Sequence, residues 1–492
     1  MNVKYEKYKR VYRMLATLIM VAVEAAIFWY VWMTYYNVDE VMGAGLTYAK
    51  RGNYVMTGLY VIFLFTFMNL YGASKIGYQK LTNMVYSQSL SVVCVNVITY
   101  LETSLMSNRM AVVSPILFMT VADVASIIVV SFILNYGYTR MFPPRKLLFV
   151  YGDYPESAAN LFYKMNGRKE KYLIDDQVHY SLGFPALKEK IDAHPQGVIM
   201  CDVPVHLRNK LIKYCYGGSI RVYVCPSISD IILRNSEDLH FFDTPIFLAR
   251  NGGMSIEQKL IKRLMDIVIS GVGLIVASPF MLFTALAIKL YDGGPVFYRQ
   301  ARATNGGRVF YITKFRSMIV NAEQDGRVIP ATERDPRITP VGHIIRATRM
   351  DELPQLLDIL KGDMSVVGPR PERLEHVEKY TKDIPEFGFR LKVKGGLTGF
   401  AQIYGKYNTS AYDKLKLDMM YIENYSVLLD IKLILMTVKI LFMKESTEGF
   451  TDEKSSDMTR IGLEGAKGRM GEQPQGQAEE QTGEQVEKGD GS

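Results

Sequence analysis

The stretch IVISGVGLIVASPFMLFTALAI, at positions 267–288, decides the fold because it determines on which side of a membrane the residues after it lie. It carries no charge and is long enough to cross about 30 Å of hydrocarbon as a helix. Ser278 and Pro279 stand near its middle. A proline bends or breaks a helix, and a serine hydroxyl can bond the carbonyl that is freed there. The stretch therefore predicts either a kinked span or a helix that breaks and returns to the same side.

The flanks of this stretch are basic on both sides, so neither flank looks external under the positive-inside rule. The basic residues are Lys259, Lys262 and Arg263 before it and Lys289, Arg299 and Arg302 after it. This pattern argues against an ordinary span, but taken alone it leaves both alternatives open.

Four further apolar segments precede this stretch, and each is about long enough to span a membrane as a helix. They are residues 14–36, 54–71, 86–106 and 110–138. Lysines and arginines gather before the first segment, in the second loop and after the fourth. The positive-inside rule assigns these parts, and the chain that follows residue 140, to the cytoplasm.

Three acids interrupt the apolar segments: Glu24, Glu102 and Asp123. An ionisable residue inside a membrane can mark a transport path. It can also make a polar contact between helices or lie near an interface. Because no second charge accompanies any of the three, we favour the helix-contact interpretation.

Strands and helices alternate in the next part of the chain. Residues 146–152, 197–204 and 221–226 read as strands, and residues 156–165 and 206–214 read as helices. This alternation predicts a parallel sheet and hence a Rossmann-like domain over 141–250. The single Gly152 after the first strand is no dinucleotide fingerprint, so a structural, regulatory or pairing role is favoured over nucleotide binding.

Composition excludes several classes of protein. The chain has 492 residues and a net charge of +8, yet its 32 Tyr and 26 Met are not typical of a nucleic-acid binder, so no nucleic-acid partner is expected. The four cysteines show no metal-binding spacing and no disulfide framework. Residues 451–492 are rich in Gly, Gln and Glu and are predicted to be a disordered tail.

The region 251–450 combines neighbouring acids with many cations. In DELPQLLDIL, starting at Asp351, four leucines fall on one helical face, Asp351 is a possible N-cap, and Gly362 suits the C-terminal stop. Asp351 and Glu352 can cap a helix, bind metal, accept a proton or attack phosphorus. A capped helix beside a basic surface explains the pattern equally well. The candidate phosphate-binding cations are Lys314, Arg316, Arg346, Arg349 and Arg370.

Residues 258–443 resemble the bacterial sugar transferase family, the monotopic polyprenyl-phosphate phosphoglycosyltransferases. The matching motifs, in order, are KLIKRLMD, GGPVFYRQ, YITKFRSM, RMDELPQL, LKGDMSVVGPRP, GLTGFAQIYGK and LDMMYIENYS. Together with the preceding segments, they resemble the long form of these enzymes. The expected fold class is membrane α plus α/β. It has four transmembrane helices (1–140), a Rossmann-like parallel α/β domain (141–250) and a mixed α/β catalytic domain (251–450) with a re-entrant helix at 264–290.

The resemblance implies transfer of a sugar-1-phosphate from a UDP-sugar to undecaprenyl phosphate, with release of UMP. This reaction initiates exopolysaccharide, capsule or O-antigen synthesis. It implies ping-pong kinetics, because a phosphosugar-aspartyl intermediate forms before the lipid phosphate attacks. The implied setting is the bacterial inner membrane, with membrane lipid around the chain and the catalytic domain on the cytoplasmic face. Relatives of the long form also suggest a homodimer.

The resemblance also assigns roles to residues. Asp351 is the nucleophile, and Glu352 helps to hold Mg²⁺ or handles a proton. Lys314, Arg346 and Arg370 match positions that bind phosphates and uridine, and Arg316 is placed with them as a phosphate-binding candidate. Asp418 and Tyr421 match an active-site or fold-supporting motif. Ser278 and Pro279 mark the break of the re-entrant helix.

Two positions depart from the family pattern. Ala301 stands where relatives often carry an acid, and GGLTG (395–399) replaces the more usual PGITG. Both bear on donor fit or local turn geometry and not on the reaction. A different class of function, a non-catalytic membrane scaffold that binds sugar nucleotides during polysaccharide assembly, would also explain the large membrane and α/β portion. The intact set of Asp351, Glu352, Arg346 and Arg370 argues against it.

Overall fold

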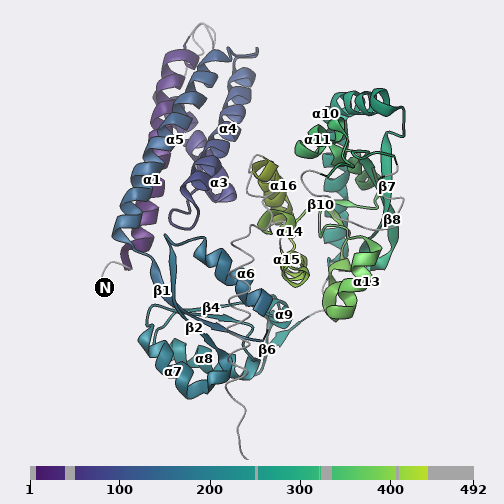
Figure 1. Ribbon diagram of the computed structural model, residues 1–492. Coiled ribbons are helices and arrows are strands. Elements are labelled where there is room, and N and C mark those ends of the chain that lie inside the picture. Colours follow the sequence, from purple (N-terminus) through teal and green to yellow (C-terminus); the bar gives the residue numbers. More distant parts are fainter. Residues whose placement is uncertain are drawn as a thin grey trace, which may run out of the picture. The chain divides into compact units, whose positions relative to one another are not determined.

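The computed structural model describes residues 7–38, 50–153, 155–249, 253–320, 322, 335–405 and 409–441 (Figure 1). The chain divides into two compact units, Met1–Pro143 with Pro226–Gly449 and Pro144–Cys225 with Phe450–Ser492. The predicted disordered tail, 451–492, lies outside the described residues.

Four long helices pack side by side in the N-terminal part of the first unit. They are α1 (Lys9–Val31, continued by the π-helical turn η2, Trp32–Tyr36), α3 (Lys50–Tyr71), α4 (Leu81–Met106) and α5 (Ser114–Met141). All four are long and apolar enough to cross a membrane. These helices, with the similarly apolar α10 described below, indicate a membrane-associated protein.

The acids inside these helices are less isolated than the sequence suggested. The expectation that no second charge accompanies any of them is wrong for Glu24 on α1 and Asp123 on α5, which are neighbours. Ser126 Oγ of α5 lies 2.7 Å from Glu24 Oε1 and 2.8 Å from the main-chain carbonyl oxygen of Asp123. The reason lies in the packing, which brings together two helices that are far apart in sequence. The interpretation of these acids as contacts between helices is confirmed for this pair.

The second unit is a doubly wound α/β domain. Its sheet has the order β2-β1-β3-β4 and all three pairings are parallel, as the alternation of strands and helices predicted. This is the flavodoxin-like order of such folds. The strands are β1 (Arg145–Tyr151), β2 (Tyr172–His179), β3 (Val198–Cys201) and β4 (Val222–Val224), and the helices are α6 (Pro155–Asn166), α7 (Gly183–Ala193) and α8 (Val205–Gly217).

Alternate residues of β1 face opposite sides of this sheet. Leu148 and Val150 pack with α7 and α8, whereas Leu147 and Phe149 pack with α6. Helices thus cover both faces, which explains why the strand is a continuous apolar run. At its end, a Cβ on Gly152 would lie 1.8 Å from the Asp202 carbonyl oxygen, so Gly152 permits close packing there.

The remainder of the first unit has an apolar core and three two-stranded ribbons. Strands β7 (Phe297–Ala303) and β8 (Val309–Phe315) are antiparallel, and β9 (Ser365–Val367) and β10 (Gly396–Thr398) are parallel. A third ribbon, β5 (Glu237–Phe241) with β6 (Thr244–Leu248), is fully exposed. The helices are α9 (Ile228–Arg234), α10 (Ile256–Asp292), α11 (Pro340–Ala347), α12 (Gln355–Lys361), α13 (Leu374–Asp383), α14 (Phe400–Tyr404), α15 (Ala411–Glu423) and α16 (Val427–Leu441), with 3₁₀ turns η3 (Tyr180–Leu182, in the second unit), η4 (Asn305–Gly307), η5 (Met350–Glu352) and η6 (Pro385–Lys392).

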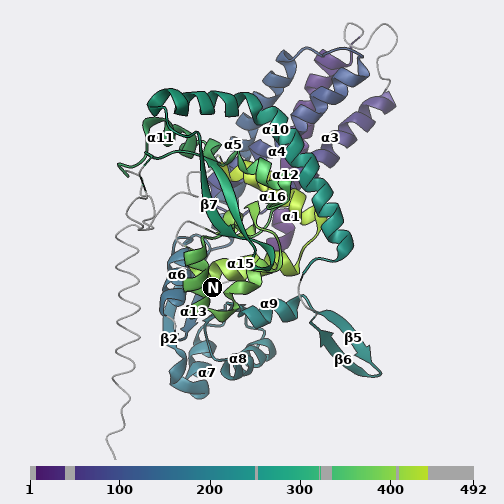
Figure 2. The ribbon, with the colours of Figure 1, turned by 90° about the vertical axis from the view of Figure 1, so that its right-hand side faces the viewer.

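Helix α10 is 37 residues long and bends (Figure 2). A straight helix of this length would measure about 55 Å, well beyond the thickness of a hydrocarbon layer. Pro279 divides α10 into a first arm before it and a second arm after it. The exposed side of both arms is apolar. The exposed residues include Leu260, Leu264, Val268, Val272, Ile275, Phe280, Phe283, Leu286 and Leu290.

Candidate active site

Asp351 and Glu352 lie in the short 3₁₀ turn η5 and not at the start of an α-helix. The prediction that Asp351 caps the following helix is wrong, because α12 begins only at Gln355, after Pro354. Arg349, just before the turn, has the left-handed φ of 60°, which is uncommon for a residue other than glycine. This sharp change of direction separates α11 from α12 and presents the two acids between them. The predicted C-terminal stop at Gly362 is confirmed.

Glu352 is clamped between two cations. Its Oε1 accepts hydrogen bonds from Lys314 Nζ at 2.8 Å and from Arg370 Nη2 at 2.5 Å. Burial favours the neutral acid, but the charges of Arg370 and Lys314 outweigh it and hold the pKa of Glu352 well below its usual range. Glu352 is therefore a permanent anion that orients both cations.

Asp351 has a different environment although it is the next residue. Its carboxyl makes no hydrogen bond with any described residue, and its distance to Lys314 Nζ is 4.0 Å. Burial raises the pKa of Asp351, while the charge of Lys314 acts in the opposite direction. The side chain keeps 13% of its surface exposed, so a ligand can reach it. A partly exposed carboxylate with free oxygens and a raised pKa is suited to bond formation.

Arg346, on α11, completes the cationic surroundings of Asp351. Its positive charge lowers the pKa of Asp351, as does that of Arg349. The Nη1 atom of Arg346 is buried and has no hydrogen-bond partner among the residues that the structure describes. Guanidinium groups bind phosphate oxygens through two parallel hydrogen bonds. Arg346 thus has a free donor near the acid that the sequence identified.

Arg370 is held in place from behind by a residue that sequence reasoning missed. Arg390 Nη2 donates to the carbonyl oxygen of Arg370 at 2.9 Å, and the same guanidinium forms ion pairs with Asp418 at 2.8 Å and with Glu372 at 3.5 Å. Burial raises the pKa of Asp418 to about 6, while Arg390 lowers it. Asp418, one of the predicted site residues, therefore acts on Arg370 through Arg390.

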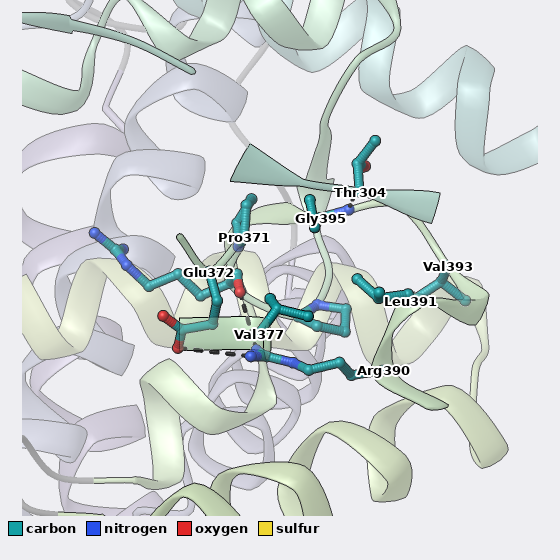
Figure 3. Close-up of a pocket in the computed structure, with 11 residues that line it drawn as sticks. Thr304, Pro371, Glu372, Val377, Arg390, Leu391, Val393 and Gly395 are labelled. Atoms are coloured by element: carbon teal, nitrogen blue, oxygen red, sulfur yellow. Dashed lines mark hydrogen bonds and ion pairs between the residues drawn. The ribbon is translucent and has the colours of Figure 1, made fainter. Parts of the chain in front are cut away.

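A pocket opens beside this ion-pair network (Figure 3). Arg390 and Glu372 line it on one side, and Thr304 and Gly395 lie on another. The Gly395 N–H donates to Thr304 Oγ1 at 3.2 Å, a bond that proline at this position could not make. A Cβ on Gly395 would lie 2.4 Å from Pro371 Cγ. The glycine that departs from the family pattern is thus fitted to its local surroundings.

Two predicted site residues make their described contacts elsewhere. The hydroxyl of Tyr421 accepts from Lys262 Nζ at 3.1 Å and lies 2.9 Å from Asp430 Oδ1, to which it donates, in a buried network. Arg316 is ion-paired with Asp292 at the end of α10. Tyr421 therefore supports the fold, and phosphate binding by Arg316 remains a prediction.

Polar residues attach the first arm of α10, before Pro279, to the part of the first unit that carries Asp351. Lys262 forms an ion pair with Asp430 at 2.6 Å, Arg263 donates to the Ile359 carbonyl at 2.7 Å, and Asp266 accepts from the Val366 N–H at 2.8 Å. Sequence reasoning missed these roles. The signal was present in the polar residues Lys262, Asp266 and Ser270, which are spaced four apart on one side of an otherwise apolar helix.

The second arm of α10 contacts the same part of the first unit. Ile288 is buried with Phe315 and Ile345, close to the Arg316–Asp292 pair. Between the arms, Ser278 Oγ donates to the carbonyl oxygen of Ile275 at 2.8 Å. This carbonyl lies four residues before Pro279, so it is the one that the proline leaves without an N–H partner. The predicted hydrogen bond of Ser278 to a carbonyl freed by Pro279 is thereby confirmed, while α10 continues through both residues without a break.

The carboxylates of Asp351 and Glu352 fit a magnesium ion that takes its other ligands from substrate phosphates and water. Glu352 uses Oε1 for both of its described hydrogen bonds, and Asp351 uses neither oxygen. No group of three or more His, Cys, Asp or Glu side chains in the described part of the chain is arranged to hold a metal ion. Mg²⁺ is commonly held by one or two carboxylates with substrate phosphates and water, so Asp351 and Glu352 could hold it beside a bound diphosphate.

Comparison with known proteins identifies the family of the chain. The model of the bacterial sugar transferase family matches residues 257–444. A UDP-glucose:undecaprenyl-phosphate glucose-1-phosphate transferase of Caulobacter vibrioides is 38% identical over 211 residues, which are 41% of this chain and 78% of that protein. The chain therefore belongs to the bacterial sugar transferase family.

Two further relatives match a similar share of this chain but a smaller share of their own length. The protein of the same name from Klebsiella pneumoniae is 42% identical over 207 residues, covering 41% of this chain and 44% of that protein. An undecaprenyl-phosphate galactose phosphotransferase of Salmonella typhimurium is 34% identical over 240 residues, covering 46% and 50%. The chain thus spans about half the length of these relatives.

Proposed function

We propose that this protein transfers a sugar-1-phosphate from a UDP-sugar to undecaprenyl phosphate, with Asp351 as the nucleophile. The observation that carries the proposal is the unequal environment of two neighbouring acids. Glu352 is bonded to Lys314 and Arg370, whereas Asp351 is free of hydrogen bonds with described residues and stands among cations. The names of the relatives support the substrate classes, since they specify a UDP-sugar or undecaprenyl phosphate.

The donor diphosphate is bound by the cations around Asp351. Lys314 contributes a point charge, and Arg346 contributes a guanidinium with an unpartnered buried nitrogen. Arg370 is fixed by Glu352 in front and by Arg390 behind. These positive charges offset the repulsion between the attacking carboxylate and the anionic donor. They also stabilise the charge that develops on the departing phosphate.

Catalysis proceeds in two displacements. A carboxylate oxygen of Asp351 bonds to the phosphorus nearest the sugar, and the bond from that phosphorus to the oxygen bridging to UMP breaks. UMP leaves with the electron pair. An oxygen of undecaprenyl phosphate then attacks the same phosphorus, which breaks the aspartyl–phosphate bond and restores the carboxylate. One anhydride replaces another, so no net proton or ATP is consumed.

Glu352 acts on this reaction as a fixed anion. It stays ionised because of Arg370 and Lys314, so it orients cations and is a poor proton carrier near neutral pH. Asp351 and Glu352 together would hold Mg²⁺, which supplies additional positive charge at the transferred phosphate when bound.

Helix α10 is the membrane anchor of the site in this proposal. Both arms contact the same catalytic core, through Asp266 on one arm and Ile288 on the other, while the outward side is apolar. This supports a re-entrant helix that enters the cytoplasmic leaflet of the inner membrane and returns. A lipid-borne phosphate and a water-soluble donor would then meet at the same surface. A homodimer remains a prediction.

Trapping the intermediate tests the nucleophile. The full-length protein in nanodiscs is mixed with Mg²⁺ and a UDP-sugar without undecaprenyl phosphate, then quenched and digested. Mass spectrometry should find the sugar phosphate on the peptide that contains Asp351, and Asp351→Asn should lose it. An adduct on another residue, or full UMP release by Asp351→Asn, would refute the assignment.

Cysteine labelling tests the course of α10. On a background without the four native cysteines, Lys259→Cys and Arg299→Cys are each probed in sealed vesicles with an impermeant maleimide. Both should react from the cytoplasmic side only. Reaction from opposite sides would show that α10 crosses the membrane.

A further inference from the structure

All four N-terminal helices meet at one buried polar cluster, which the proposed transferase chemistry does not use. On α5, Ser126 Oγ donates to Glu24 Oε1 of α1 at 2.7 Å. On α4, Asn96 Nδ2 donates to Asp123 Oδ2 of α5 at 2.8 Å, and the hydroxyl of Tyr60 on α3 donates to Asn96 Oδ1 at 3.3 Å. The cluster lies deep within the helices, since Asp123 is about 14 Å along α5 from its start at 1.5 Å per residue.

The two acids of this cluster each have an oxygen without a donor. Asp123 is fully buried and Glu24 is 3% exposed. Asp123 Oδ1 and Glu24 Oε2 have no hydrogen-bond partner among the described residues. Unsatisfied carboxylate oxygens are costly in an apolar environment, and two adjacent negative charges are more costly still. A proton bound between the two groups would remove both costs.

The position of Ser126 shows that the two acids are neighbours. Its Oγ donates to Glu24 Oε1 at 2.7 Å and lies 2.8 Å from the main-chain carbonyl oxygen of Asp123. Ionised carboxylates only accept hydrogen bonds, so a proton on one acid is the donor that the unpartnered oxygens lack. The side chains hydrogen-bonded within this cluster are neutral at physiological pH: Tyr60 of α3, Asn96 of α4, and Thr120 and Ser126 of α5. No basic side chain is paired with either acid in the described part of the chain.

We propose that Glu24 and Asp123 form a binding site for one proton, held between their carboxyl groups, that links α1 to α5. The proton satisfies an otherwise unpaired oxygen and removes one of two like charges. The N-terminal helices thus form a proton-binding bundle, separate from the Asp351 chemistry. Removing the proton at alkaline pH leaves two facing carboxylates, which repel and loosen the bundle.

Infrared spectroscopy tests the bound proton directly. The full-length protein and the double variant Glu24→Gln/Asp123→Asn are compared in nanodiscs at neutral pH. The amides preserve shape and can hydrogen-bond to each other without a proton. The difference spectrum should contain the carbonyl band of a neutral carboxylic acid, shifted in D2O and unchanged when Na⁺ is replaced by choline. Absence of this band, or carboxylate bands that respond to Na⁺, would overturn the proposal in favour of an ionised pair or a sodium site.

Thermal unfolding across pH tests the link between α1 and α5. The wild-type protein should lose melting temperature on the alkaline side, and the double variant should lack this loss. Glu102→Gln is the matched control, because Glu102 is a half-buried acid of α4 without a carboxyl partner among the described residues, and it should behave as wild type. Equal alkaline losses in wild type and double variant would contradict the link.

Discussion

Arg370 Nη2 lies 2.5 Å from Glu352 Oε1, closer than Lys314 Nζ at 2.8 Å on the same oxygen. One carboxylate oxygen thus fixes two cations that stand on different elements, β8 and the loop after β9. The arrangement makes Glu352 an organiser of positive charge.

Glu352→Gln should slow UMP release while leaving Asp351 able to form the adduct. The amide cannot balance two cations, so Arg370 and Lys314 lose their fixed positions. We expect a loss of about 10- to 100-fold in kcat/KM, as when a group that orients a ligand-binding residue is removed. Initial rates of UMP release check this, together with adduct formation at Asp351 by mass spectrometry. A variant that turns over normally would contradict the role of Glu352.

Lys314→Gln should shift the acid limb of the pH–rate profile to higher pH. Activity requires ionised Asp351, so the rate falls as pH drops through the pKa of Asp351. Burial already raises that pKa and the charge of Lys314 lowers it, so removal of Lys314 raises it further. The measurement is kcat/KM for the donor across pH. Arg308→Gln, which removes an exposed cation paired with Asp363, is the control and should leave the limb in place.

Arg390→Lys should weaken the site without touching the donor. Lysine cannot contact the Arg370 carbonyl, Asp418 and Glu372 together, as the planar guanidinium does. We expect kcat/KM to fall by about 10- to 100-fold while the adduct still forms at Asp351. Lys392→Gln, an exposed cation on the same turn, is the control. Equal rates for both variants would show that Arg390 does not position Arg370.

Tyr421→Phe should reduce stability more than catalysis. The change removes a buried hydroxyl that accepts from Lys262 and donates to Asp430, which costs about 1–3 kcal/mol. A lower melting temperature with nearly unchanged kcat at permissive temperature is expected. A large loss of kcat in a stable variant would instead place Tyr421 in the reaction.

Much of this architecture could be predicted from local patterns. The apolar helices, the parallel sheet and the hydrogen bond of Ser278 to the carbonyl freed by Pro279 depend on residues close together in sequence, where periodicity and hydrogen-bonding needs act directly. The acid pair Asp351–Glu352 was found for the same reason. Its exact setting was not, because the 3₁₀ turn after the left-handed Arg349 packs against β8, which is distant in sequence.

Contacts between segments far apart in the chain could not be predicted from the sequence. Arg390 and Arg370 are separated by α13, and Glu24 and Asp123 by two whole helices, so only the folded chain brings each pair together. Charge pairing at such separations has no local signature. The polar residues of α10 did have one, in their spacing of four, but the apolar residues around them concealed it.

The inward polar side of α10 has a practical consequence for anyone trimming this protein for crystallography or assay. A fragment starting after Asp292 would leave the main-chain carbonyl of Ile359 and the N–H of Val366 without their partners, and Asp430 without its lysine. Such a fragment should be insoluble. The apolar helix α10 and the residues around Asp351 fold as one unit, so this half of the polypeptide has to be purified in detergent or lipid.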